Sequence, residues 1–115
     1  MESQPNILVL MTDQQRFDAL GCAGNDKIQT PNLDRLAASG VHFPQAFCPT
    51  PICVSSRMSF ITGLRASRHH WVTNHALPGP VPELPTIMTL LHRAGYHTQG
   101  IGKMHFRGRL YGFQD

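Results

Sequence analysis

The sequence lacks concentrated charge. Only 15% of its 115 residues are charged, and 10 Lys and Arg against 7 Asp and Glu leave a net charge of +3. These charges are dispersed, with no run of Lys and Arg, no zinc-finger spacing and no interleaving of basic and aromatic residues. Proteins that bind nucleic acid usually carry at least one of these patterns, so we expect no nucleic-acid partner.

Cysteine and long apolar runs are scarce as well. Three Cys is an odd number, which argues against a complete disulfide framework. Cys48 and Cys53 stand without a second Cys pair, so a structural zinc site is not expected. The apolar run from Ile7 to Met11 is too short for a signal peptide or a membrane span. We therefore expect no membrane partner and a cytoplasmic location.

The chain does contain an alternation of strand and helix patterns. The apolar run bounded by Pro5 predicts a buried parallel strand over residues 6–12. Thr30 as N-cap, Pro31 at the first helical position and Gly40 at the end predict a helix between them. Further strands are predicted over 41–47 and 96–102, and further helices over 54–63 and 86–94. This order predicts an α/β fold with a mostly parallel sheet flanked by helices.

Helical spacing also predicts which side chains form the core. The expected inward-facing residues are Leu33, Leu36, Ala37, Ile87, Leu90 and Leu91, and Met58, Phe60, Ile61 and Trp71 are interpreted as packing residues. Residues 65–85 are expected to be a loop, in which His69 and His70 are interpreted as solvated side chains, with the alternative that one of them contacts a bound substrate.

Cys53 begins the most informative stretch of the sequence. Pro49 and Pro51 disfavour a helix before it, and the residues after it have a helical pattern. A helix N-terminus stabilises an anion through its unpaired N–H groups and its dipole. Arg57 lies one turn along such a helix, where its side chain can point back toward position 53. The alternative is a buried structural thiol beside a surface arginine.

Polar groups also follow two of the predicted strands. Asp13 and Gln14 fall at the C-terminal end of the first strand, where open α/β sheets bind ligands. Lys103 and His105 follow strand 96–102 and, two residues apart, share a face of an extended chain. Three chain segments can therefore deliver polar groups to one edge of the sheet. The alternatives are an N-cap role for Asp13 and solvated or packing roles for the other three.

These segments together resemble the N-terminal part of a type I sulfatase, a family within the alkaline-phosphatase-like superfamily. Four blocks carry the resemblance, in order and over nearly the whole chain: residues 6–14, 30–43, 53–64 and 94–105. One position departs from the family pattern. The family usually has Pro, and sometimes Ala, two residues after the Cys, where this chain has Ser55.

The resemblance implies a site and a reaction. Cys53 would be oxidised to formylglycine by a formylglycine-generating enzyme, and the hydrated aldehyde would attack the sulfur of a small anionic sulfate ester. Asp13, Gln14 and the group derived from Cys53 would bind a divalent metal, Ca²⁺ or alternatively Mn²⁺ or Mg²⁺. Arg57 would orient the formylglycine, Lys103 would contact it and the sulfate, and His105 would transfer protons.

Two other interpretations remain open. The Asp13–Gln14 pair resembles the branch of the superfamily that contains phosphonate monoester hydrolases and choline sulfatase, so hydrolysis of phosphonate monoesters or phosphodiesters is an alternative function. The chain is also much shorter than the family's catalytic domain, so we expect residues 1–115 to be a truncated N-terminal part of that domain. Such a part would lack further metal ligands and would be inactive by itself.

Overall fold

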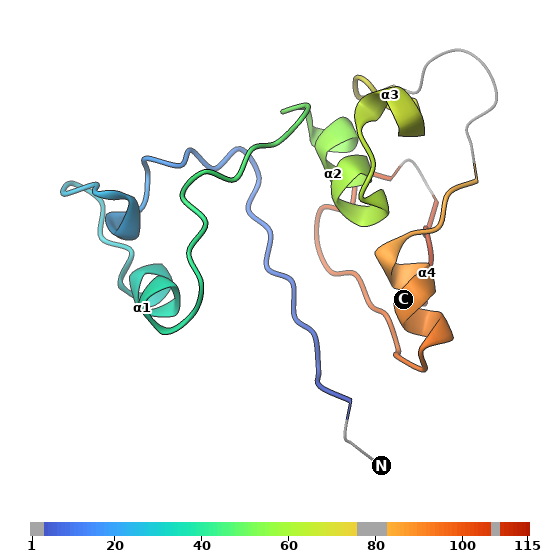
Figure 1. Ribbon diagram of the computed structural model, residues 1–115, viewed down its shortest axis with the longest axis horizontal. Coiled ribbons are helices and arrows are strands. Elements are labelled where there is room, and N and C mark those ends of the chain that lie inside the picture. Colours follow the sequence, from blue (N-terminus) through green and yellow to red (C-terminus); the bar gives the residue numbers. More distant parts are fainter. Residues whose placement is uncertain (1–3, 76–82, 107–108) are drawn as a thin grey trace. The chain divides into compact units, whose positions relative to one another are not determined.

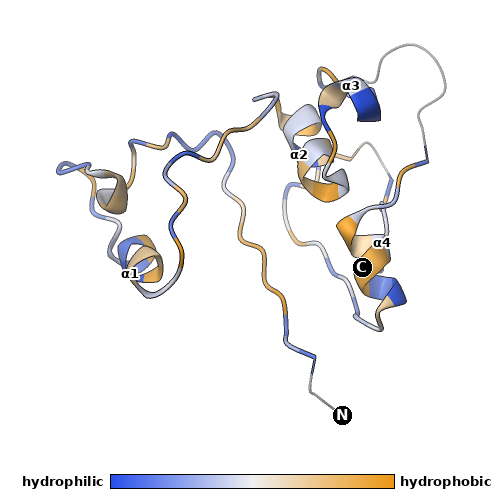
Figure 2. Ribbon diagram, viewed as in Figure 1, coloured by the Kyte–Doolittle hydropathy of each residue, from blue (hydrophilic) through white to orange (hydrophobic). Residues whose placement is uncertain are grey.

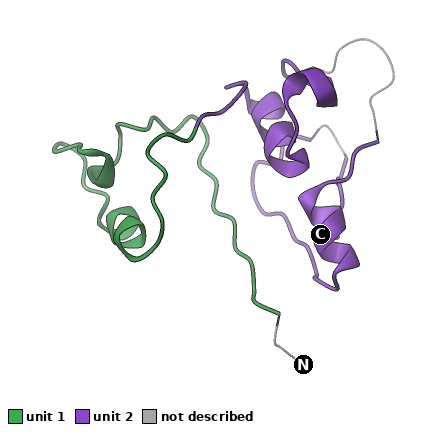
Figure 3. Cartoon of the chain, in the orientation of Figure 1, with its two compact units in different colours: residues 1–46 green, residues 47–115 purple. Residues whose placement is uncertain are grey.

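The computed structural model describes residues 4–75, 83–106 and 109–115, and the chain divides into two compact units (Figure 3). Unit 1 comprises residues 1–46 and unit 2 comprises residues 47–115. Within the described residues the regular structure is helical, with a short 3-10 helix and four α-helices (Figure 1). Each unit is held together by its own internal contacts.

Unit 1 is organised around the carboxylate of Asp34. The helix α1 spans Pro31–Ser39 and the 3-10 helix η1 spans Gly21–Ala23. Asp34 Oδ1 accepts the backbone N–H of Cys22 at 2.7 Å and the hydroxyl of Thr30 at 2.9 Å, and Thr30 Oγ1 accepts the N–H of Gly21 at 2.8 Å. These bonds tie η1 to the first turn of α1. Gly21 is required because an added Cβ would lie 2.5 Å from the Asp34 carboxylate.

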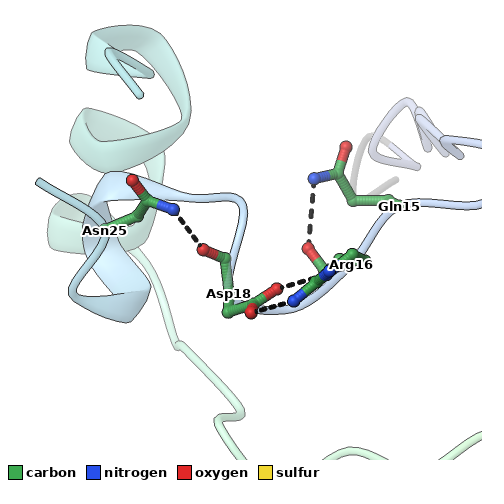
Figure 4. Close-up of polar contacts among 4 residues, drawn as sticks. All are labelled: Gln15, Arg16, Asp18 and Asn25. Carbon is green, nitrogen blue, oxygen red and sulfur yellow. Dashed lines mark hydrogen bonds and ion pairs between the residues drawn. The ribbon is translucent and has the colours of Figure 1, made fainter. Parts of the chain in front are cut away.

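The loop before η1 is held by its own polar contacts. The Arg16 guanidinium makes a two-point ion pair with Asp18, and the Asn25 side chain donates to the Asp18 carbonyl at 2.6 Å (Figure 4). Hydrogen bonding to Arg16 lowers the pKa of Asp18 from its usual range. The pair is exposed to solvent, so its contribution to stability is small.

Unit 2 contains the hydrophobic core. Helix α2 spans Cys53–Thr62, α3 spans Ala66–His69 and α4 spans Ile87–Arg93. The core comprises the buried residues Val54, Met58, Ile61, Trp71, Met88 and Phe106. Helix α2 packs against α3 and also contacts α4. Gly63 ends α2 with a left-handed φ of 69°, which a side chain would strain.

The C-terminal residues are anchored to α4 and to the segment that follows it. The Thr86 side chain caps α4 in a reciprocal capping box with Thr89, and its hydroxyl also donates to the carbonyl of Tyr111 at 2.5 Å. Thr98 donates to the carbonyl of Gly112 at 2.8 Å. Gly112 approaches Thr89 so closely that a Cβ would lie 2.6 Å from that side chain.

The predicted helices are confirmed and the predicted sheet is not. The helices over 30–40, 54–63 and 86–94 correspond to α1, α2 and α4, and their ends agree to within a residue or two. Within the described residues the structure contains no strand at 6–12, 41–47 or 96–102. The apolar segment 7–11 is extended but exposed, with Leu8 80% and Leu10 79% accessible (Figure 2). A strand exists only through hydrogen bonds to a neighbour, and the described residues provide no backbone partner for segment 7–11.

The predicted core faces of two helices are wrong for most of their residues, and only Ala37 and Leu91 of these faces are partly buried. Leu33 and Leu36 are exposed, and α1 has no buried residue. On α4 the buried residue is Met88, whereas Ile87 and Leu90 are exposed. Met58, Ile61 and Trp71 are buried as predicted, but Phe60 is exposed. These exposed apolar side chains have no covering element among the described residues of their own unit.

The loop predicted over 65–85 includes the short helix α3, and its part 76–82 lies outside the described residues. No helix within the described ranges has the length and apolar character needed to cross a bilayer.

Candidate active site

Cys53 is the first residue of α2, as the sequence predicts, and its side chain is half-buried. The preceding residue, Ile52, has an extended backbone and no side-chain oxygen with which to cap the helix. Asn74 supplies the missing acceptor, because its Oδ1 accepts the N–H of Val54 at 3.2 Å. The Cys53 end of α2 is therefore capped by a residue 20 positions further along the chain.

Lys103 meets Cys53 at this helix end. Its ammonium lies 3.9 Å from the Cys53 sulfur, in hydrogen-bonding geometry for a sulfur acceptor. Arg57, one turn further along α2, donates through its guanidinium to the backbone carbonyl of Lys103 at 2.6 Å. Arg57 thus fixes the backbone from which Lys103 extends. A helix N-terminus and an ammonium group together form an environment that favours a bound anion beside Cys53.

His105 and Gln14 share an uncommon backbone conformation. Their φ angles are 58° and 56°, in the left-handed region, and both side chains are exposed. Among the described residues only His70 and Tyr111 are other non-glycine residues with positive φ. Left-handed backbone at a non-glycine residue is associated with functional sites. Two of the four such positions are thus residues that the sequence placed in the site.

Asp13 and Gln14 belong to unit 1, whereas the Cys53, Arg57 and Lys103 cluster and His105 belong to unit 2. The structure thus brings together three predicted site residues by direct contact, and His105 follows two residues after Lys103. A carboxylate and an amide oxygen are suitable donors for a hard divalent cation. Within the described ranges, however, no three His, Cys, Asp or Glu side chains converge in a group that could hold a metal. Asp13 and Gln14 therefore have the type of oxygen donor that a hard divalent cation prefers, but they are fewer than such a cation requires.

His69 is buried, contrary to the prediction of a solvated side chain. Its accessible fraction is 0%, its Nδ1 accepts the N–H of Trp71 at 3.1 Å, and its Nε2 lies 3.0 Å from the Ser59 hydroxyl. Burial lowers the pKa of His69 below the usual value for histidine. His69, the last residue of α3, therefore packs against α2.

Ser55, the residue that departs from the family pattern, is also fully buried. Its accessible fraction is 0%, and its hydroxyl has no hydrogen-bond partner among the described residues. It lies in the first turn of α2, where a proline can be accommodated without loss of an intrahelical hydrogen bond.

Comparison with known proteins identifies the family. The sulfatase family model matches residues 5–109. The chain is 44% identical over 102 residues to an arylsulfatase from Clostridium perfringens, covering 89% of this chain and 21% of that protein. It is 37% identical to the uncharacterized sulfatase YidJ of Escherichia coli, covering 94% and 21%, and 38% identical to human steryl-sulfatase, covering 90% and 19%. No solved structure gave a significant match.

These matches show that the chain belongs to the sulfatase family. The chain spans about a fifth of the length of these curated relatives. The family has an alkaline-phosphatase-like α/β fold, of which the described residues contain helices only.

Two residues at the site were not found from the sequence. Neither the capping role of Asn74 nor the burial of His69 has a local pattern, because each depends on a contact with α2 made by a later segment. A helix that starts without a capping side chain, as at Ile52, is the one signal in the sequence that some distant acceptor is needed.

Proposed function

We propose that this chain contributes to a sulfuric ester hydrolase in which Cys53 is the precursor of the nucleophile. The contact between the Lys103 ammonium and the Cys53 sulfur carries the proposal. A sulfate ester is an anion, and its cleavage requires a nucleophile next to positive charge. The N-terminus of α2 and Lys103 provide that charge at one point, and family membership supports the same chemistry.

The residues of unit 2 then have separate roles. Lys103 binds the sulfate oxygens beside position 53 and stabilises the charge that develops on them. Arg57 holds the Lys103 backbone at 2.6 Å and so keeps the ammonium in position. His105 transfers a proton during the reaction, a role for which imidazole side chains are suited. Because the backbone of His105 is left-handed, its side chain leaves the chain in a different direction than it would from an extended backbone.

Oxidation of Cys53 to formylglycine by a formylglycine-generating enzyme would supply the nucleophile at the start of α2. Asp13 and Gln14 would bind a divalent cation, which would supply Lewis-acid stabilisation of negative charge. We propose Ca²⁺, with Mn²⁺ or Mg²⁺ as the alternatives, because both side chains offer hard oxygen donors. Asp13, Gln14 and the group derived from Cys53 would be too few ligands for such a cation, so we propose that this chain provides only part of the metal site.

One assay distinguishes this function from the alternative hydrolysis of phosphonate monoesters or phosphodiesters. The assay uses a protein that contains this chain and has the full length of its relatives, which we call the relative-length form. Its turnover of an aryl sulfate and of a phenylphosphonate ester is measured in parallel. Sulfate-ester turnover that is lost with a chelator and restored by Ca²⁺ is expected. Faster turnover of the phosphonate ester would favour the second function, which the neutral Gln14 beside Asp13 supports.

The chain of 115 residues by itself is proposed to be inactive. Hard-cation sites need about six to eight oxygen ligands, and the described residues have no cluster of three candidates. Sulfate-ester turnover by these 115 residues alone would contradict this part of the proposal.

A further inference from the structure

The chain that follows α2 returns along the helix and contacts it at two separate points. His69 reaches the Ser59 hydroxyl in the second half of α2, at 3.0 Å. Asn74 reaches the backbone N–H of Val54 in the first turn, at 3.2 Å. We call residues 69–74 the brace. Both anchors lie on the helix that begins with Cys53, and one of them is on the residue next to Cys53.

Hydrogen bonding fixes the tautomer of the His69 ring. A backbone N–H can only donate, so Nδ1, which receives the Trp71 N–H at 3.1 Å, carries no proton. In the neutral ring the proton is then on Nε2, which donates to Ser59 Oγ. Both nitrogens are occupied and the side chain is fully buried. His69 therefore links the turn after α3 to α2 by two directed bonds.

The anchor at Asn74 acts on the helix end itself. The first N–H groups of a helix need acceptors from outside it, and Ile52 offers no side-chain acceptor. Trp71, buried in the core between the two anchors, connects them along the chain. Release of His69 from Ser59 would free the segment that carries Asn74, and the first turn of α2 would fray.

We propose that His69 is a positioning residue for Cys53: through its bond to Ser59 it holds the brace on α2 and so keeps the first turn, with Cys53, against Lys103. This inference rests on the proposed function only in taking Cys53 as the reactive group. The brace acts on Cys53 through helix α2, to which it is bound at Ser59 and Val54.

Thiol labelling of the 115-residue chain tests the inference without any enzymatic activity. Iodoacetamide is added at one pH, and peptide masses give the alkylation rate of Cys53 divided by that of Cys22, which lies in unit 1 of the same molecule. His69→Ala and His69→Asn should raise this ratio by about threefold to tenfold, the change typical of losing one hydrogen bond. The side chain of Asn can accept the Trp71 N–H but is too short to reach Ser59.

His69→Gln is the conservative rescue, because its amide N–H can occupy the place of Nε2 and donate to Ser59. It should keep the ratio within about twofold of the wild type. Asn74→Ala should raise the ratio as His69→Ala does, since it removes the second anchor. The fluorescence of Trp71, the single Trp of the sequence, reports burial in every variant.

Two matched controls separate positioning from general stability. Ile61→Val lowers core packing at the other end of α2 and should leave the labelling ratio unchanged. His70→Asn replaces an exposed neighbour and should also leave it unchanged. The inference is overturned if His69→Gln labels as fast as His69→Ala, if Ile61→Val raises the ratio equally, or if wild-type Trp71 emits as an exposed indole. Failure of the proposed function is separate, because it would appear as an absence of sulfate-ester turnover in the relative-length form while the labelling pattern of the 115-residue chain stays as predicted.

Discussion

The ammonium of Lys103 lies 3.9 Å from the sulfur of Cys53, although 50 residues separate them in the sequence. The approach is held from the other side by Arg57, whose guanidinium binds the Lys103 carbonyl at 2.6 Å. Cys53 thus lies next to the ammonium group of Lys103. The backbone of Lys103 is held by Arg57, which belongs to the same helix as Cys53. This relationship predicts that Arg57 affects the site through the position of Lys103.

Substitution of Lys103 should therefore lower turnover in the relative-length form. Lys103→Ala removes the ammonium and should reduce kcat/KM for a sulfate ester by about 10²–10³-fold, the usual effect of losing a preorganised charge donor. Lys27→Ala, which removes an exposed lysine in unit 1, is the matched control and should leave kcat/KM unchanged. A Lys103→Ala enzyme with wild-type kinetics would remove Lys103 from the site.

Loss of His105 should affect kcat more than substrate binding. A positioned proton-transfer group contributes about 10²–10⁴-fold to rate, so His105→Ala should lower kcat by an amount in that range with a smaller change in KM. Steady-state kinetics of the relative-length form between about pH 6 and 8 measure this effect. His92→Ala, at an exposed position on α4, serves as control. Unchanged kcat across this range would exclude His105 from the chemistry.

Two serines of α2 should respond to alanine in opposite directions. Ser55 has a buried hydroxyl without a partner among the described residues, so Ser55→Ala should be neutral or stabilise by up to about 1 kcal/mol. Ser59→Ala removes the partner of His69 and should destabilise by about 1–2 kcal/mol. Urea unfolding followed by Trp71 fluorescence compares the two. Equal effects of both substitutions would contradict the assigned hydrogen bonding.

His69 should make the stability of unit 2 depend on pH. Burial lowers its pKa in the folded chain, so below the ordinary histidine pKa the unfolded chain binds more protons than the folded chain. The stabilising contribution is then complete above about pH 6.5 and is lost as pH falls from there through the lower folded pKa. The wild type and His69→Gln should converge in urea midpoint as the pH falls through this window. A gap that widens toward acid would have the wrong sign.

The sequence predicted helices well because their ends are local. Pro31, Gly63 and the Thr86 capping box each act within a turn of the helix they delimit. Strands depend on partners elsewhere in the chain, so an apolar run such as 6–12 has no local means of becoming one. Which helical face is buried depends equally on neighbours, and this is why Met88, rather than Leu90, is in the core.

The site was predictable in part for the same reason. Cys53 and Arg57 lie one helical turn apart, and Lys103 follows the predicted strand 96–102, whereas its role came from the resemblance to the sulfatases. The left-handed backbone of Gln14 and His105 has no sequence signal, because neither is Gly or Asn. The hydrogen bonds of His69 and Asn74 to α2 also have no sequence signal, because they join residues that are 10 and 20 positions apart in the sequence.

The most direct test of the central claim is the chemical state of residue 53. The relative-length form is produced together with a formylglycine-generating enzyme, and the mass of the peptide that contains residue 53 is measured alongside sulfate-ester turnover. The account predicts loss of the thiol and gain of an aldehyde at this residue, with turnover in proportion to the converted fraction. It also predicts higher conversion in Ser55→Pro, which restores the usual family residue. Full turnover by a protein in which Cys53 remains an unmodified thiol would contradict the account.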